Sequence, residues 1–308
     1  MLYLFIIATI FCTLNLEGQS LTTDNPEKIS LPGVERAFYP LLSPDGSSIV
    51  FSAENRNGLF LYSFDSDKVL SISNGRASGR NPVFSPDSNY LFYSEESSSK
   101  DDGDMVVRVY SLDNNRCLLD LPGSRVKAFE QSDYRKFIRS ILNFNISSVF
   151  PDYKALKQGS FSYPYAATER GRLFYYEDCF NHRRLDPLNA RAYLHANLSP
   201  CKNFIVAYAV GHGAFVTDLN GKVVAEFGHL EAPVWLSSGI VAGMITRDDG
   251  HFITGSSLQA VNFLSGNIYD LTGDESVLMY PSVSKSNKVI VAHSNSGEIF
   301  SINYQLNN

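Results

Sequence analysis

The sequence predicts an all-β protein, a six-bladed β-propeller in which short antiparallel strands follow one another along the chain. Three observations predict this fold. A Ser-Pro turn recurs 42 residues after its first appearance, four strand-like segments fit within each repeat, and 13% of the residues are aromatic. Four strands in about 42 residues is the length of one propeller blade, and aromatic and β-branched residues favour strands.

The first two repeats show the unit most clearly. Residues 38–52 read FYPLLSPDGSSIVFS and residues 80–94 read RNPVFSPDSNYLFYS. In such a turn proline presets φ, aspartate bonds its own backbone two residues further on, and glycine tolerates a tight reversal. Each unit should therefore contain a strand, this turn and a returning strand. Two more strands complete it, at residues 59–63 and 69–72 in the first unit.

Weaker copies of the unit follow. They read ANLSPCKNFIVAY at 196–208, PVWLSSGIVAGM at 233–244 and PSVSKSNKVIVAH at 281–293. One further unit fits between residues 121 and 194, so the sequence predicts six blades. The last unit shows only three strands, and residues 27–31 can supply the fourth. A blade shared by both ends of the propeller would remove exposed sheet edges.

The Ser-Pro-Asp-Gly repeat resembles the WD40-like, or PD40, repeat of TolB-type propellers over residues 26–304. The last two blades are also similar to lone exported propellers of the Bacteroidetes type. Four short motifs carry that similarity: Ala232-Pro233-Val234-Trp235, Asp248-Asp249-Gly250-His251, Leu271-Thr272 and Met279-Tyr280-Pro281-Ser282. The resemblance implies an exported binding or scaffold protein.

The first twenty residues differ from the rest. Residues 2–16 form an uncharged apolar run, LYLFIIATIFCTLNL, followed by polar and small residues. The run is shorter than the ~20 residues of a membrane-spanning helix and fits the apolar part of a signal peptide. No Lys or Arg precedes it, and a buried or membrane-tethering segment is the alternative. We expect residues 1–20 to be a signal peptide and residues 21–308 to form the propeller, with no transmembrane segment in the mature chain.

Residues 124–165 exceed what the repeat requires. Within them apolar side chains recur with helical spacing, at Tyr134, Phe137, Ile138, Ile141 and Leu142. This spacing predicts an amphipathic helical insertion in the middle blade. The helix would either pack on the side of the propeller or dock a partner, and a blade strand is the other alternative.

Composition and motifs exclude several functions. A formal net charge of −6 and a pI near 5.5 argue against nucleic-acid binding, which usually needs a basic surface. The chain has no GxSxG, HExxH or glycine-rich phosphate loop. Beyond the leader, Cys117, Cys179 and Cys201 lack the spacing of a zinc site. A Cys179–Cys201 disulfide and buried free thiols both stay open.

One candidate site lies in the loops between second and third strands, which a propeller places on one face. The fourth blade contributes His212, and the fifth contributes Asp248, Asp249 and His251. Imidazoles and paired carboxylates can bind a divalent cation or a cationic ligand. The acidic, serine-rich loop 95–104 of the second blade belongs to the same face. Ordinary polar hairpin loops are the alternative, and we expect no cofactor other than such a cation.

A second candidate site is the axial tunnel, which the first strand of each blade lines. The residues at equivalent steps are Tyr39, Asn81, His195, Ala232 and Tyr280. Mixed aromatic and polar residues at a tunnel mouth suit a small ligand or a peptide tail. They suit packing between blades equally well.

Together these features predict a non-catalytic, exported, monomeric propeller. It would bind a protein or peptide as a scaffold in the periplasm or at the cell surface. The alternative is an enzyme acting on a glycan or small molecule, a lyase or hydrolase that uses the His/Asp loops. A deep polar pocket with perturbed pKa values would favour the enzyme, and a broad shallow face would favour the scaffold.

Overall fold

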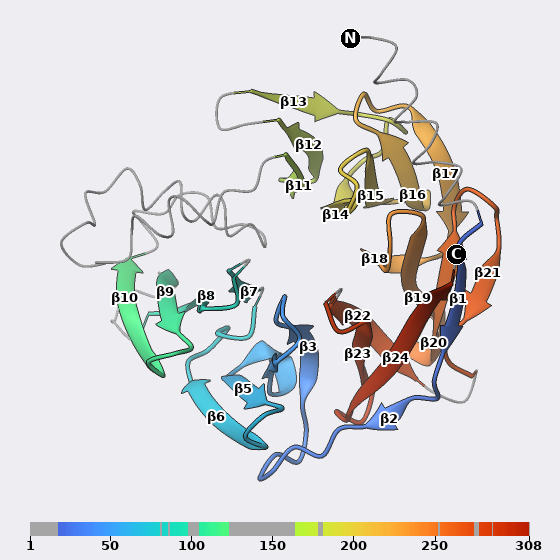
Figure 1. The fold of residues 1–308 in the computed structure, drawn as a ribbon. Coiled ribbons are helices and arrows are strands. Elements are labelled where there is room, and N and C mark those ends of the chain that lie inside the picture. The colour runs from blue at the N-terminus through green and yellow to red at the C-terminus, as the bar shows by residue number, and fades with distance from the viewer. Residues whose placement is uncertain are drawn as a thin grey trace. The chain divides into compact units, whose positions relative to one another are not determined.

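The computed structural model describes residues 18–80, 82–85, 87–97, 105–122, 164–177, 181–251, 253–273, 277–284 and 286–307. Apart from its last two residues, the insertion predicted at 124–165 lies outside them. The described strands form six antiparallel sheets (Figure 1). The chain is thus an all-β, six-bladed propeller, as predicted. Among the described residues no helix is long and apolar enough to cross a membrane.

The blades fall into two compact units. The smaller unit holds two sheets, formed by β3 (Phe38–Leu42), β4 (Ser48–Ser52), β5 (Leu59–Ser63) and β6 (Lys68–Ser73), and by β7 (Val83–Phe84), β8 (Tyr90–Glu96), β9 (Met105–Ser111) and β10 (Arg116–Pro122). A short 3-10 helix, η1 (Glu54–Arg56), joins β4 to β5. The strands therefore follow the predicted order of strand, turn, returning strand and two further strands.

The larger unit holds the other four sheets. Their strands are β11 (Tyr165–Glu169), β12 (Arg172–Tyr176) and β13 (His182–Leu185); β14 (Tyr193–Leu198), β15 (Phe204–Ala209), β16 (Gly213–Asp218) and β17 (Val223–Gly228); β18 (Glu231–Trp235), β19 (Ile240–Asp248), β20 (Ile253–Asn262) and β21 (Ile268–Asp270); and β22 (Leu278–Ser284), β23 (Val289–Ser294) and most of β24 (Ile299–Asn307), joined by β1 (Ser20–Thr23) and β2 (Glu27–Lys28).

The Ser-Pro-Asp-Gly turn forms the hydrogen bonds expected from its sequence. The Ser43 hydroxyl donates to Asp45 Oδ1 (2.6 Å), and the Ser47 backbone N–H donates to the same oxygen (3.1 Å). Burial alone would raise the pKa of Asp45, but hydrogen bonds from Ser43, Ser47 and Ser88 outweigh it and hold the pKa below its usual value. The Asp45 N–H donates to Ser88 Oγ (3.1 Å), which ties this turn to the next blade.

The hydrophobic core lies between successive sheets. In the smaller unit, side chains of β4 and β5 pack against those of β8 and β9, with Val50, Leu59, Leu91 and Tyr93 almost wholly buried. In the larger unit, three such clusters fill the spaces between neighbouring sheets. Burying both faces of a twisted sheet in this way is how a propeller forms one core from many small sheets.

The last sheet of the larger unit joins strands from both ends of the described chain. β24 pairs with β1, placing Leu21 opposite Leu306, and with β2, placing Lys28 opposite Phe300. The prediction that residues 27–31 complete this blade is confirmed for β2. The longer added strand, however, is β1, which the sequence did not indicate because its first residue falls within the expected leader 1–20.

Gln19 extends the contacts of β1. Its backbone carbonyl accepts a hydrogen bond from the fully buried Asn262 side chain (3.0 Å), and its side-chain carbonyl accepts one from Ser237. Gln19 and Ser20, which lie inside the expected leader 1–20, therefore contact the blade formed by β18–β21 and the last blade. Part of the segment predicted as leader is therefore packed against the fold.

The cysteines differ in part from expectation. Cys201 is half-buried and Cys117 is exposed, and neither forms a disulfide with a described residue. The expectation of a buried thiol is therefore wrong for Cys117, which sits on the outermost strand of its sheet. Cys179 lies outside the described residues, so its pairing stays a prediction.

Tyr304 provides a test of the last blade. Burial raises the pKa of this phenol from 10.0 to about 12, and its hydroxyl donates to the Leu236 carbonyl (3.3 Å). At a pH between these two pKa values, the unfolded chain has lost the phenol proton and the folded chain keeps it, so the free energy of unfolding should fall as the pH rises. Tyr304→Phe keeps the ring but has no phenol proton, so it removes this contribution to the pH dependence. We expect urea titrations to show that wild type loses roughly 1–2 kcal/mol more than the variant across this interval. Parallel pH dependences would contradict the burial.

Candidate functional site

Four first strands share a β-bulge at the same step. In β3, β14, β18 and β22 two residues oppose one residue of the second strand. The first of the two has a left-handed backbone, with φ of 53° at Tyr39, 54° at His195, 47° at Ala232 and 52° at Tyr280. These are four of the five positions that the repeat predicts to be equivalent. The fifth, Asn81, lies outside the described residues.

Proline follows the bulge residue in three of the four strands, at Pro40, Pro233 and Pro281. Proline has no N–H to donate, so it is tolerated where a bulge interrupts the ladder. A left-handed conformation at a residue other than glycine costs about 1–2 kcal/mol. Because four blades accept this cost at the same step, the bulge is a feature of the repeat and sets the direction of one side chain in each of these four blades.

In the larger unit the bulges form a row. The first strands β14, β18 and β22 contact one another in turn on the inner side of this unit (Figure 1). We call His195, Ala232 and Tyr280 the bulge row. His195 is exposed, Ala232 is buried and Tyr280 is half-buried. The row therefore combines an imidazole, a small central residue and an aromatic ring, without a formal charge.

Buried contacts hold the bulge row in place. The Tyr280 ring stacks on the buried His293 ring, with centroids 5.6 Å apart and planes 13° from parallel. The Trp235 indole N–H donates to the backbone carbonyl of Asn197 (3.0 Å), which joins β18 to β14. The ring stack and this hydrogen bond therefore hold Tyr280 and β18 in place.

Tyr39 differs from the bulge row. It lies in the smaller unit, and the Arg56 guanidinium carbon sits 3.7 Å from the centre of its ring. This cation–π contact covers one face of the ring. One face of the Tyr39 ring is therefore covered by Arg56 of the same blade.

His212 lies in the tight turn between β15 and β16. Its backbone N–H donates to the Ala209 carbonyl (3.0 Å), and the side chain is exposed. Gly213 has a φ of 90°, and a Cβ there would lie 1.4 Å from the Gly228 carbonyl oxygen. The glycine is therefore required by the packing of β17.

The aspartates of the fifth blade bond to their own turn. Asp248 Oδ1 accepts the N–H of Gly250 (2.9 Å), and Asp249 Oδ1 accepts the N–H of His251 (2.9 Å). All three predicted ligands here, Asp248, Asp249 and His251, are exposed. Within the described part of the chain no three His, Cys, Asp or Glu side chains are grouped as a metal site would need. A cation at these loops therefore stays a prediction.

The acidic loop of the second blade is described only at its start. Glu95 pairs with Arg108 (2.9 Å), and Glu96 pairs with Arg76 (3.3 Å). Residues 98–104 lie outside the described part. Glu95 also accepts a hydrogen bond from Ser73 of β6, and Arg76 lies between β6 and β7, so the two described carboxylates join the second blade to the first.

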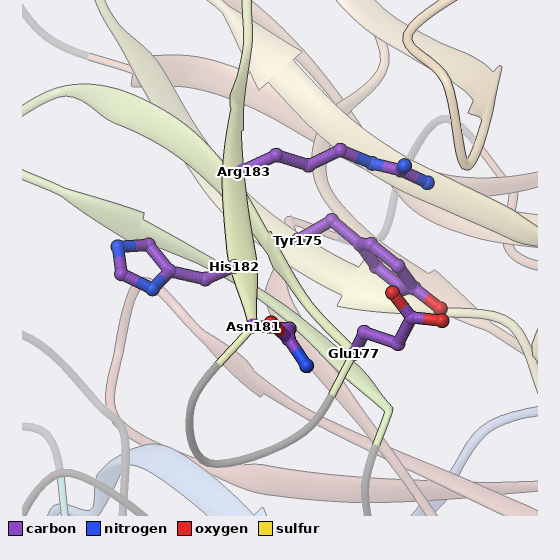
Figure 2. A pocket seen from close by; sticks show the side chains of 5 residues that line it. All are labelled: Tyr175, Glu177, Asn181, His182 and Arg183. Carbon is purple, nitrogen blue, oxygen red and sulfur yellow. The ribbon is translucent and has the colours of Figure 1, made fainter.

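The third blade carries a pocket that the sequence did not indicate. It has a volume of about 280 Å³ and is lined by Tyr175, Glu177, Asn181, His182 and Arg183 (Figure 2). These residues come from β12, from β13 and from the turn between them. The sequence signal for this pocket is the run of basic residues 182–184. Basic residues on an outer strand usually protect a sheet edge, so this run alone does not indicate a binding site.

Comparison with known proteins supports the fold and leaves the function open. No family model and no curated protein matches the sequence. A putative TolB from Agrobacterium tumefaciens is 14% identical, with a TM-score of 0.51, over 88% of this chain and 91% of that one. A chain of the mitotic checkpoint complex is 10% identical, with a TM-score of 0.54, over 91% of this chain and 94% of that one.

An oligogalacturonate lyase in complex with manganese aligns less well. It is 12% identical, with a TM-score of 0.43, over 88% of this chain and 78% of that one. Identities this low establish shared architecture alone. The chain is a β-propeller whose fold is similar to those of TolB-like and WD40-like proteins.

Proposed function

We propose that this protein is a non-catalytic propeller that binds a peptide segment of a partner protein along the bulge row. The observation that carries the proposal is the repeated left-handed bulge, which aims His195, Ala232 and Tyr280 from three adjacent strands. Such a row presents side chains at the spacing of neighbouring blades. An extended peptide could contact them in succession.

The chemistry of the bulge row suits an uncharged or aromatic peptide. Tyr280 offers a ring fixed by stacking, and His195 with the exposed Asn197 offers hydrogen bonds, while the central Ala232 adds no polar group. Rigid aromatic anchors and adaptable polar groups are common at peptide and protein interfaces. The mitotic checkpoint complex, an assembly by its description, contains a propeller of similar fold, which is consistent with this use.

The proposal includes export to the periplasm or cell surface. The apolar run 2–16 supports it. Gln19 contacts the fold through its backbone and side-chain carbonyls, and Gly18 before it is exposed, with open space around it. A small, accessible residue is what a signal peptidase needs before its cleavage point.

The intact mass of the protein purified from its native cells tests export. We expect a chain that begins at Gln19, because cleavage there removes the apolar run and keeps every contact of β1. A mature protein that retains Met1 would contradict export. A chain that begins after Thr23 would contradict the role of β1.

A peptide-display library panned on the immobilised protein tests binding at the bulge row. The test variant combines His195→Gly, which keeps the left-handed backbone, with Asn197→Ala. We expect enriched peptides to bind this variant at least about tenfold more weakly than wild type, as loss of interface hydrogen bonds implies.

Glu226→Ala is the matched control, since Glu226 is exposed on the outer strand β17. It should leave peptide binding unchanged. Failure to enrich any peptide, or equal binding to the bulge-row variant and wild type, would refute the proposed site.

A further inference from the structure

The pocket of the third blade contains two opposite charges beside one tyrosine. Arg183 lies directly opposite Tyr175 in the β12–β13 ladder, and Glu177 follows Tyr175 by two residues (Figure 2). Among the described residues neither Arg183 nor Glu177 forms an ion pair, whereas the neighbouring Arg184 pairs with Asp186 (3.2 Å). The pocket therefore presents a guanidinium and a carboxylate that no described residue of the blade pairs with.

Tyr175 separates the two charges and limits what can bind. The guanidinium carbon of Arg183 lies 5.1 Å from the centre of its ring, and the residue is only 5% exposed. Its ring belongs to the core between this sheet and the next. No ring face is therefore left on which a sugar could stack.

The Tyr175 hydroxyl stays protonated near neutral pH. Burial raises its pKa, the Glu177 carboxylate raises it further, and the Arg183 guanidinium lowers it in part. A neutral phenol can donate a hydrogen bond beside Glu177. This adds a polar group to the pocket without adding charge.

We infer that this pocket binds a small zwitterion, a free α-amino acid, with its carboxylate on Arg183 and its ammonium group on Glu177. An uncharged ligand would displace water from both charges and replace neither interaction, which is unfavourable. A simple anion or cation would satisfy one charge only. The volume of about 280 Å³ lies below the ~300–1,000 Å³ of drug-sized pockets and suits a ligand of this size.

Ligand-observed NMR and calorimetry with the individual proteinogenic amino acids test the inference on the full chain. We expect saturable binding of at least one amino acid. Its N-acetyl derivative lacks the ammonium group and its carboxamide lacks the carboxylate. Each should bind roughly ten- to a hundredfold more weakly.

Two substitutions test which side chain binds which charged group of the amino acid. Arg183→Gln should remove the preference for the acid over its carboxamide, and Glu177→Gln should remove the preference for the free amine over its N-acetyl form. Arg184→Gln is the matched control on the same strand and should change neither preference. All three positions are on the surface, and melting temperatures verify that the variants fold.

Absence of binding by every amino acid at millimolar concentration would overturn the inference. So would binding that neither Arg183→Gln nor Glu177→Gln weakens. The pocket lies on β12 and β13, whereas the bulge row lies on β14, β18 and β22. The His195→Gly/Asn197→Ala variant should therefore bind the amino acid as wild type does, so failure of one proposal does not affect the other.

Discussion

The antiparallel pairing of β24 with β1 and β2 is the interaction on which the larger unit depends. It places Leu21 in the same buried cluster as Ile240, Ile290 and Tyr304, which belong to the last two blades. Without β1, strand β24 would expose one ladder edge and this cluster would lose part of its cover. Because β22 lies in the same sheet, the position of Tyr280 in the bulge row depends on this pairing.

The β-bulges are the second constraint that the repeat imposes. A first strand turns one side chain away from the regular alternation at a left-handed residue in β3, β14, β18 and β22. The same device therefore serves blades whose sequences have diverged. What differs is the side chain it presents: Tyr39 is covered by Arg56, Tyr280 rests on His293, and His195 is exposed. This variation on a constant backbone is how one fold can acquire a specific binding surface.

Turn chemistry and alternating strands made most of the fold predictable. The Ser43–Asp45 hydrogen bond and the equivalence of Tyr39, His195, Ala232 and Tyr280 follow from local sequence, because proline and aspartate act within a few residues. The role of β1 was not predictable, since its partner strand lies at the other end of the chain. The pocket at Tyr175 was also missed, because its charges are ordinary surface residues until β12 and β13 bring them together.

Amide hydrogen exchange tests the central role of the β1–β24 pairing most directly. The comparison is between the chain that begins at Gln19 and the chain that begins at Ile29, which lacks β1 and β2. If this pairing holds the larger unit together, protection should fall in β18, β19, β22 and β23 as well as in β24, because these strands share one buried cluster. Loss of protection confined to the newly exposed edge of β24 would contradict the account.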